Sequence, residues 1–388
     1  MIIGSTRWRP GLEGEDISRP TCPDDAQVPG RIAHLLHAPC TADDWRAATL
    51  HCLRKRLFPE LDWLAVHAPG GEGHDFVLRQ SPCFALDIPS RKRFAMASDA
   101  GPDDGDLAIL QEWIEQRRPE SVEISLSWNE LALKPVQELA GLLTKAPCAV
   151  HLNLSCCGWA PPALRDLCDA MSRNPHVASL NLGGARLDTD GSKALQGLLT
   201  VTQLSSLSLV GAKFPDTDDF QRLCEALAGN TSLLHLAIGN HGTLTIRQAS
   251  SLSEALQTHR SLQELEIEAL ELQAGSAHAD RRHVPDGLIA NGELRKLTLR
   301  TTALNQQDCD ALEALLGRED CRLRCLCIDT VDPTGSAAVV RAVLANRSLT
   351  QVHPWLYPDT ASQLEATFRS CSSVTTQENV LNAALGKP

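Results

Sequence analysis

Apolar residues recur along this chain in short strand-like groups, each followed by a longer helix-like group. Within residues 176–200, Leu180 and Leu182 alternate with polar residues as in a β-strand, and glycine and aspartate residues then mark a turn. Leu195 and Leu198 follow at a spacing that places them on one face of a helix. This order predicts a strand, a turn and a helix within one short unit.

The same unit recurs along most of the chain, with spacings of 27 to 32 residues between equivalent positions. The strand-like part of each copy contains two apolar residues separated by one position. These pairs are Ile124/Leu126, Leu152/Leu154, Leu180/Leu182, Leu207/Leu209, Leu236/Ile238, Leu265/Ile267, Leu297/Leu299 and Leu326/Ile328. A weaker ninth copy lies around Val352. Because one copy cannot bury its apolar face alone, stacked copies are expected to share a continuous core.

The repeat predicts an α/β fold in which each strand pairs with the strands of the copies before and after it, forming a parallel sheet. Side chains of successive strand residues point to opposite faces, so the paired apolar residues should face the core. The residues between them should line a concave surface. The helices should form the convex side.

The pattern L-x-x-L-x-L-x-x-N/C-x-L is legible in these copies, with Asn129 and Cys157 at the N/C position of the first two. It resembles the leucine-rich repeat family, specifically the ribonuclease-inhibitor subtype with a helix in each repeat. The resemblance covers residues 118–370 and implies a horseshoe-shaped solenoid. Later copies lack Asn or Cys, so their turns should need water or another partner for backbone groups. The residues at that position are Ala185, Ala212, Thr302 and Val331.

Four regions are expected along the chain. Residues 1–27 are rich in Pro, Gly, Arg and Asp and are predicted to be disordered. Residues 28–117 are predicted to form a helical region and a capping repeat, with a strand at 91–99 and a helix at 103–119. About nine repeats then occupy 118–370, and 371–388 should form a C-terminal cap.

Residues 28–58 are similar in outline to an F-box, which would dock a ubiquitin ligase while the repeats bind a substrate. The segment lacks the acidic residue after Pro29 and the late Trp that an F-box has. The alternative is a short helical cap that covers the end of the repeats.

Composition and charge narrow the classes of function that the protein can have. The 388-residue chain has a formal net charge of −12, which argues against a general nucleic-acid binder. It contains no run of 18 apolar residues and no secretory signal at its start, so we expect no membrane span. The expected location is cytoplasmic, or secreted into a host cell without a cleaved signal peptide, and the expected state is a monomer.

The use of arginine over lysine, 28 to 8, is typical of high-GC bacterial genomes. Leucine-rich proteins of plant- or animal-associated bacteria are commonly type III secreted effectors. The favoured hypothesis is therefore a bacterial effector that recognises a host protein.

No catalytic motif is found, so we expect a binding protein and not an enzyme. The 14 cysteines fit small, reduced core residues. Cys325 and Cys327 should both face the concave side, but no convincing set of metal ligands accompanies them, so neither metal nor cofactor is expected.

The candidate binding site is the concave surface, where an acidic strip on one strand lies beside a basic strip on the next. This pattern has two interpretations: neutralisation between strands, or a charge-patterned surface that orients a protein partner. Trp128 is the strongest candidate for an anchor residue. The full candidate set is Trp128, His151, Asn153, His235, Glu264, Glu266, Glu268, Arg295, Lys296, Arg300 and Arg324.

Overall fold

The computed structural model describes the repeats in most detail. The described residues are 48, 51–52, 54–67, 83–87, 105–126, 130–131, 133–159, 163–201, 203–240, 246–269, 284–301, 306–328, 342–343 and 345–354. The chain divides into two compact units, Met1–Ala178 and Ser179–Pro388. The predicted disordered segment and C-terminal cap lie outside the described residues, and so does the strand predicted at 91–99.

Unit 1 alternates strands and helices in the predicted order. Its elements are α2 (Phe58–His67), β1 (Cys83–Asp87), α3 (Asp106–Arg117), β2 (Ser121–Ser125), β3 (Glu130–Leu131), α4 (Leu133–Lys145), β4 (Ala149–Asn153), β5 (Gly158–Trp159) and α5 (Ala163–Ser172). β1 pairs in parallel with β2, and β2 with β4. β3 and β5 form a separate two-stranded parallel sheet. Helix α3 confirms the helix predicted at 103–119.

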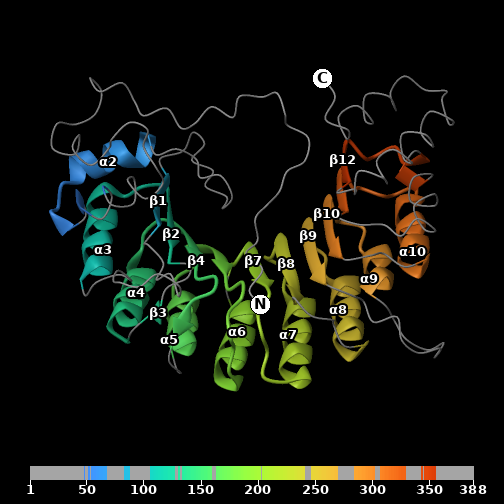
Figure 1. The fold of residues 1–388 in the computed structure, drawn as a ribbon, viewed down its shortest axis with the longest axis horizontal. Coiled ribbons are helices and arrows are strands. Elements are labelled where there is room, and N and C mark those ends of the chain that lie inside the picture. The colour runs from blue at the N-terminus through green and yellow to red at the C-terminus, as the bar shows by residue number, and fades with distance from the viewer. Residues whose placement is uncertain are drawn as a thin grey trace, which may run out of the picture. The chain divides into compact units, whose positions relative to one another are not determined.

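Unit 2 contains the later repeats. Its strands are β6 (Val177–Asn181), within which the unit boundary falls, β7 (Ser206–Val210), β8 (His235–Asn240), β9 (Glu264–Ala269), β10 (Lys296–Thr301), β11 (Cys325–Ile328) and β12 (Gln351–Pro354). Its helices are α6 (Thr189–Val201), α7 (Thr217–Gly229), α8 (Ile246–Thr258), α9 (Val284–Ala290) and α10 (Gln306–Leu316). Each strand pairs in parallel with the next. Figure 1 shows these helices on one side of the strands.

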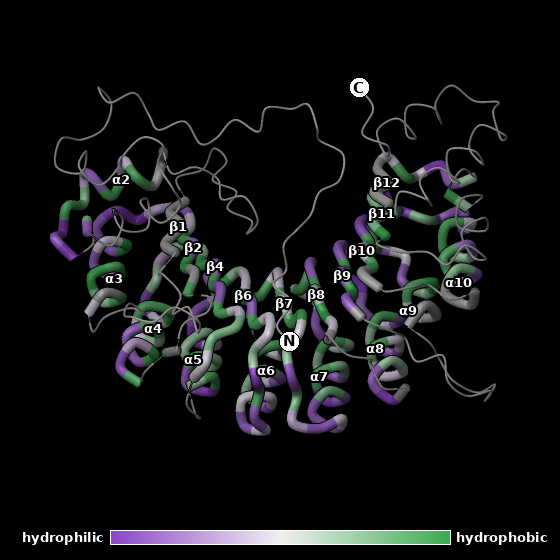
Figure 2. The backbone as a smooth tube through the Cα atoms, viewed as in Figure 1, coloured by the Kyte–Doolittle hydropathy of each residue, from purple (hydrophilic) through white to green (hydrophobic). Residues whose placement is uncertain are grey.

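The paired apolar residues form the core, as the repeat pattern predicted. All sixteen are at most 6% exposed, from Ile124 at 0% to Leu299 at 6%. On α6, Leu195, Leu198 and Leu199 are buried against the strands. In Figure 2, hydrophobic and hydrophilic residues alternate along the helices of the repeats, as one buried face requires. Burying a leucine side chain contributes about 1.5–3 kcal/mol, so stacking of the copies is the main source of stability.

Aspartate residues start two successive helices. The Asp188 carboxylate accepts a hydrogen bond from the Gly191 N–H at 2.7 Å, at the start of α6. Asp216 is the N-cap of α7 and accepts from the Asp219 N–H at 2.7 Å. An acidic N-cap satisfies a free backbone donor and interacts favourably with the helix dipole.

The turns at two equivalent positions of the repeat make different hydrogen bonds. At the N/C position of the repeat, the Cys157 thiol donates to the Leu126 carbonyl, with the sulfur 2.8 Å from the oxygen. At the equivalent Ala185, the backbone carbonyl accepts from the Lys213 N–H at 2.8 Å. The alanine side chain makes no such bond, and the turn there is joined to the next repeat through its backbone. Asn129, Thr302 and Val331 lie outside the described residues.

Asparagine side chains connect the end of one repeat to the helix of the repeat before it. The Asn230 side-chain amide donates to the Leu199 carbonyl at 2.7 Å. Its oxygen accepts from the N–H groups of Ser232 at 3.0 Å and Leu233 at 2.7 Å. The same arrangement of donor and acceptor bonds occurs at Asn174, Asn291 and Asn346.

His259 takes the asparagine position in the repeat that follows α8. It is 2% exposed, and neither of its ring nitrogens has a hydrogen-bond partner. The side-chain bonds that asparagine makes elsewhere are therefore missing at this junction. Val201, at the same position at the end of α6, also lacks them but is exposed, whereas His259 is buried. The His259 carbonyl accepts from Asn291 at 3.0 Å.

Candidate functional site

The candidate site of unit 2 lies on the open face, which we define as the face of its sheet opposite the helices. In the described part of the chain, no helix covers this face (Figure 1). Parallel pairing in register arranges its side chains in rows across the strands. The first row is Ser179, Ser206, His235, Glu264, Lys296 and Cys325. The second row is Asn181, Ser208, Ala237, Glu266, Thr298 and Cys327.

In the first row, Glu264 contacts two other predicted residues, His235 and Lys296, on the neighbouring strands. The Glu264 carboxylate lies 3.2 Å from His235 Nδ1 and 3.6 Å from Lys296 Nζ. The three side chains are between 42% and 47% exposed, so water weakens each pair to about 0–1 kcal/mol. Neutralisation between strands therefore does occur at Glu264, while all three groups stay accessible to a partner.

Glu266 and Glu268 extend the acidic strip along β9, and both are half-buried. Glu268 is in register with Gly239 on β8 and with Arg300 on β10. A Cβ atom at Gly239 would collide with the backbone of Glu268, so only glycine fits there. This glycine lets β8 and β9 approach closely where Glu268 stands.

Arg295 and Arg324 do not follow the alternation of the open face. Each lies immediately before a strand, is exposed, and begins the backbone pairing of its repeat. The Arg295 N–H donates to the Gln263 carbonyl at 2.7 Å, and the Arg324 N–H donates to the Arg295 carbonyl at 2.7 Å. Assigning both to the concave rows was therefore wrong by one position, because the strands begin one residue later, at Lys296 and Cys325.

In unit 1, His151 and Asn153 occupy alternate positions of β4. They are in register with Glu123 and Ser125 of β2. Desolvation by burial lowers the pKa of His151, which favours the neutral imidazole. The Asn153 side chain accepts from the Ser155 N–H at 3.1 Å, so it also shapes the turn after the strand. The predicted anchor Trp128 lies outside the described residues.

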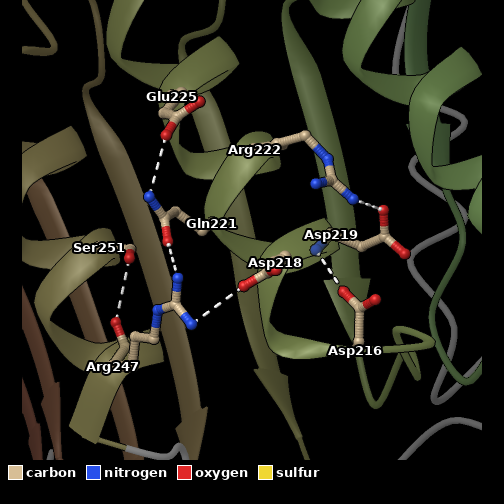
Figure 3. Close-up of polar contacts among 8 residues, drawn as sticks. All are labelled: Asp216, Asp218, Asp219, Gln221, Arg222, Glu225, Arg247 and Ser251. Carbon is tan, nitrogen blue, oxygen red and sulfur yellow. Dashed lines mark hydrogen bonds and ion pairs between the residues drawn. The ribbon is translucent and has the colours of Figure 1, made fainter.

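A second polar network, which the sequence analysis missed, joins α7 and α8 on the helix side of unit 2 (Figure 3). The Arg247 guanidinium lies 3.0 Å from the Asp218 carboxylate and donates to the Gln221 carbonyl oxygen at 2.9 Å. Gln221 in turn donates to Glu225 at 3.1 Å. These exposed contacts fix neighbouring helices to each other and present no chemistry beyond that.

The region that resembles an F-box is described only at 48, 51–52 and 54–58. Ala48 and Cys52 are buried there, which suits either a cap or a helical adaptor. Among the residues that the structure describes, no helix has the length and apolar character to span a membrane. Within that same part of the chain, no three His, Cys, Asp or Glu residues gather as metal ligands.

Comparisons with known proteins agree with the repeat architecture. No family model matches the chain. Human NACHT, LRR and PYD domains-containing protein 13 is 29% identical over 204 residues, which are 52% of this chain and 19% of that protein. Ribonuclease inhibitor from Sus scrofa is 27% identical over 236 residues, 59% of this chain and 50% of the inhibitor.

Two further proteins are similar over shorter stretches. Capping protein, Arp2/3 and myosin-I linker protein 3 from Rattus norvegicus is 33% identical over 144 residues, 36% of this chain and 10% of that protein. The tropomodulin C-terminal domain from Caenorhabditis elegans aligns with 40% of this chain and 92% of its own, at 16% identity and a TM-score of 0.33, which is too low to carry a conclusion. The chain thus spans half or less of the length of these curated relatives.

The repeated strand and helix, the parallel pairing and the curated relatives together define a leucine-rich repeat protein of the α/β class. Within that class, the helix in each repeat and the match to ribonuclease inhibitor make it ribonuclease-inhibitor-like.

Proposed function

We propose that this protein recognises another protein through the open face of unit 2. The observation that carries the proposal is the network of His235, Glu264 and Lys296, which holds polar and charged side chains of three strands in one accessible row. Complementary charge on a partner would give orientation and a faster association rate more than raw affinity. Relatives with the same repeats include a ribonuclease inhibitor and a linker of capping protein, Arp2/3 and myosin-I, whose names denote protein partners.

The similarity to ribonuclease inhibitor also supports binding over catalysis, because that relative is an inhibitor by name. The proposed setting is a bacterial effector that meets a host protein, which rests on composition alone. The competing proposal of a ubiquitin-ligase adaptor rests on residues 28–58. Deletion of residues 28–58 distinguishes the two proposals. An adaptor would lose its ligase and keep its substrate, whereas a recognition protein would keep its only partner.

The test is quantitative capture from a host-cell lysate followed by measurement of affinity with the purified partner. The bait is the full chain, beside a variant with Glu264, Glu266 and Glu268 changed to Lys. We expect a protein that binds the wild type and loses at least tenfold in affinity for the variant.

A matched control changes three exposed acidic residues of the helices, Asp190, Glu254 and Glu313, to Lys. It alters net charge equally and leaves the open face intact. Equal loss of binding in both variants would assign the effect to net charge and contradict a docking role for the open face. Equal binding by all three proteins would contradict it as well.

A further inference from the structure

Two cysteine side chains lie together on the open face. Cys325 and Cys327 are separated by one residue on β11, so the strand alternation brings both to the same side. Their sulfur atoms are 3.9 Å apart, and both residues are free thiols of intermediate burial. By contrast, Cys168, Cys224 and Cys309 are buried core residues. The pair is therefore an accessible dithiol.

The neighbouring strand supplies a positive charge beside the pair. Cys325 is in register with Lys296, and Cys327 with Thr298. Burial, followed by the charge of Cys327 and the hydrogen bond with it, raises the pKa of Cys325 to about 11; Lys296 acts in the opposite direction, and the charge of Glu264 also raises it. Cys325 therefore keeps its proton at neutral pH and is a poor nucleophile. A thiol-binding metal ion can still displace that proton.

We propose that Cys325 and Cys327 bind one soft monovalent metal ion of the copper(I) class as a two-coordinate dithiolate. Thiolate ligands favour such ions over hard cations. Two metal–sulfur bonds of about 2.3 Å can join sulfur atoms up to about 4.6 Å apart, and the observed 3.9 Å lies within that reach.

A two-coordinate ion also suits what surrounds the pair. Tetrahedral zinc needs four ligands, and the described part of the chain gathers no cluster of three or more His, Cys, Asp and Glu side chains. The balance of the reaction is simple: the ion replaces one proton on each thiol, two protons leave, and the bound complex carries one negative charge. Lys296, which is also paired with Glu264, stands in register to offset part of that charge.

The test is an anaerobic titration of the reduced full chain with copper(I), in competition with the chromophoric chelator bathocuproine disulfonate. Cys325→Ser and Cys327→Ser should each lose one tightly bound equivalent. The matched control, Cys156→Ser with Cys321→Ser, removes two other half-buried thiols and should keep it. Lys296→Gln should weaken binding about two- to fivefold, the effect of one exposed charge.

Equal copper binding by the wild type and both single serine variants would overturn the proposal. Zinc(II) bound as tightly as copper(I) would overturn it as well. Thermal unfolding of each variant verifies that it is folded, and Cys325→Ala and Cys327→Ala repeat the test with side chains that cannot hydrogen-bond. Because this site needs no protein partner, its failure leaves the proposed recognition function untouched.

Discussion

Replacing Asn230 with alanine tests whether the asparagine side chains hold neighbouring repeats together. The residue is 5% exposed, and its side chain makes four hydrogen bonds, to the Leu199 carbonyl, to the N–H groups of Ser232 and Leu233 and to the Ser232 hydroxyl. Alanine removes all four and leaves the Leu199 carbonyl and the buried Leu233 N–H without this partner. An unsatisfied buried polar group costs about 1–3 kcal/mol. The free energy of unfolding should therefore fall by about 3 kcal/mol.

The assay is urea unfolding followed by far-ultraviolet circular dichroism and by amide hydrogen exchange. Exchange matters because repeat arrays do not always unfold in one step, and the loss should be greatest in α6, β7 and β8. The matched control is Thr231→Ala, an exposed neighbour that should change stability by less than about 0.5 kcal/mol. If Asn230→Ala costs no more than the control, the side chain is not the connection that its geometry indicates.

Two further changes test single positions. His259→Asn should stabilise the protein by about 1 kcal/mol by restoring the missing bonds. Burial lowers the pKa of His259, so the unfolded chain takes up a proton first, and wild-type stability should fall as the pH drops below about 6.5. Urea midpoints at pH 5 and 7.5 should show this loss in the wild type and not in the variant. Equal pH dependence in the two proteins would contradict this account. Gly239→Ala should cost more than about 2 kcal/mol in thermal unfolding, since its Cβ would strike the Glu268 backbone, whereas Gly229→Ala, with open space around it, should not.

The repeat architecture could be read from the sequence because burial imposes a strict spacing. A leucine pair every 27 to 32 residues has one consistent solution, stacked parallel strands, and all sixteen residues are buried as predicted. The asparagine connections were missed although a signal exists: a buried apolar residue, at or just before the start of the next strand, follows three positions after Asn174, Asn230, Asn291 and Asn346. Their role depends on carbonyls about thirty residues away, which no local pattern reveals.

The candidate site was predicted less completely. Alternation identifies His235, Glu264 and Lys296 correctly as neighbours on one face, because parallel strands in register carry equivalent positions side by side. It fails for Arg295 and Arg324, since periodicity does not determine the residue at which a strand begins. It also cannot say that Lys296 pairs with Glu264 through its ammonium, which depends on the rotamers of long side chains.

The substitution of histidine for asparagine at position 259 has a consequence for how the array comes apart. In a linear array each repeat is stabilised by its immediate neighbours, so cooperativity breaks where one coupling is weakest. Asn230 and Asn291 reinforce the junctions on either side, whereas His259 contributes no side-chain bond to its own and buries two ring nitrogens without partners. Val201, at the same position at the end of α6, is exposed and buries no unpaired polar group. We expect the boundary between two folding units to fall there, with the repeats from β9 onward opening as a group while those from β7 to α7 keep their protection. A surface that includes His235 and Glu264 would then join residues from both folding units, and a partner bound across them would suppress that opening.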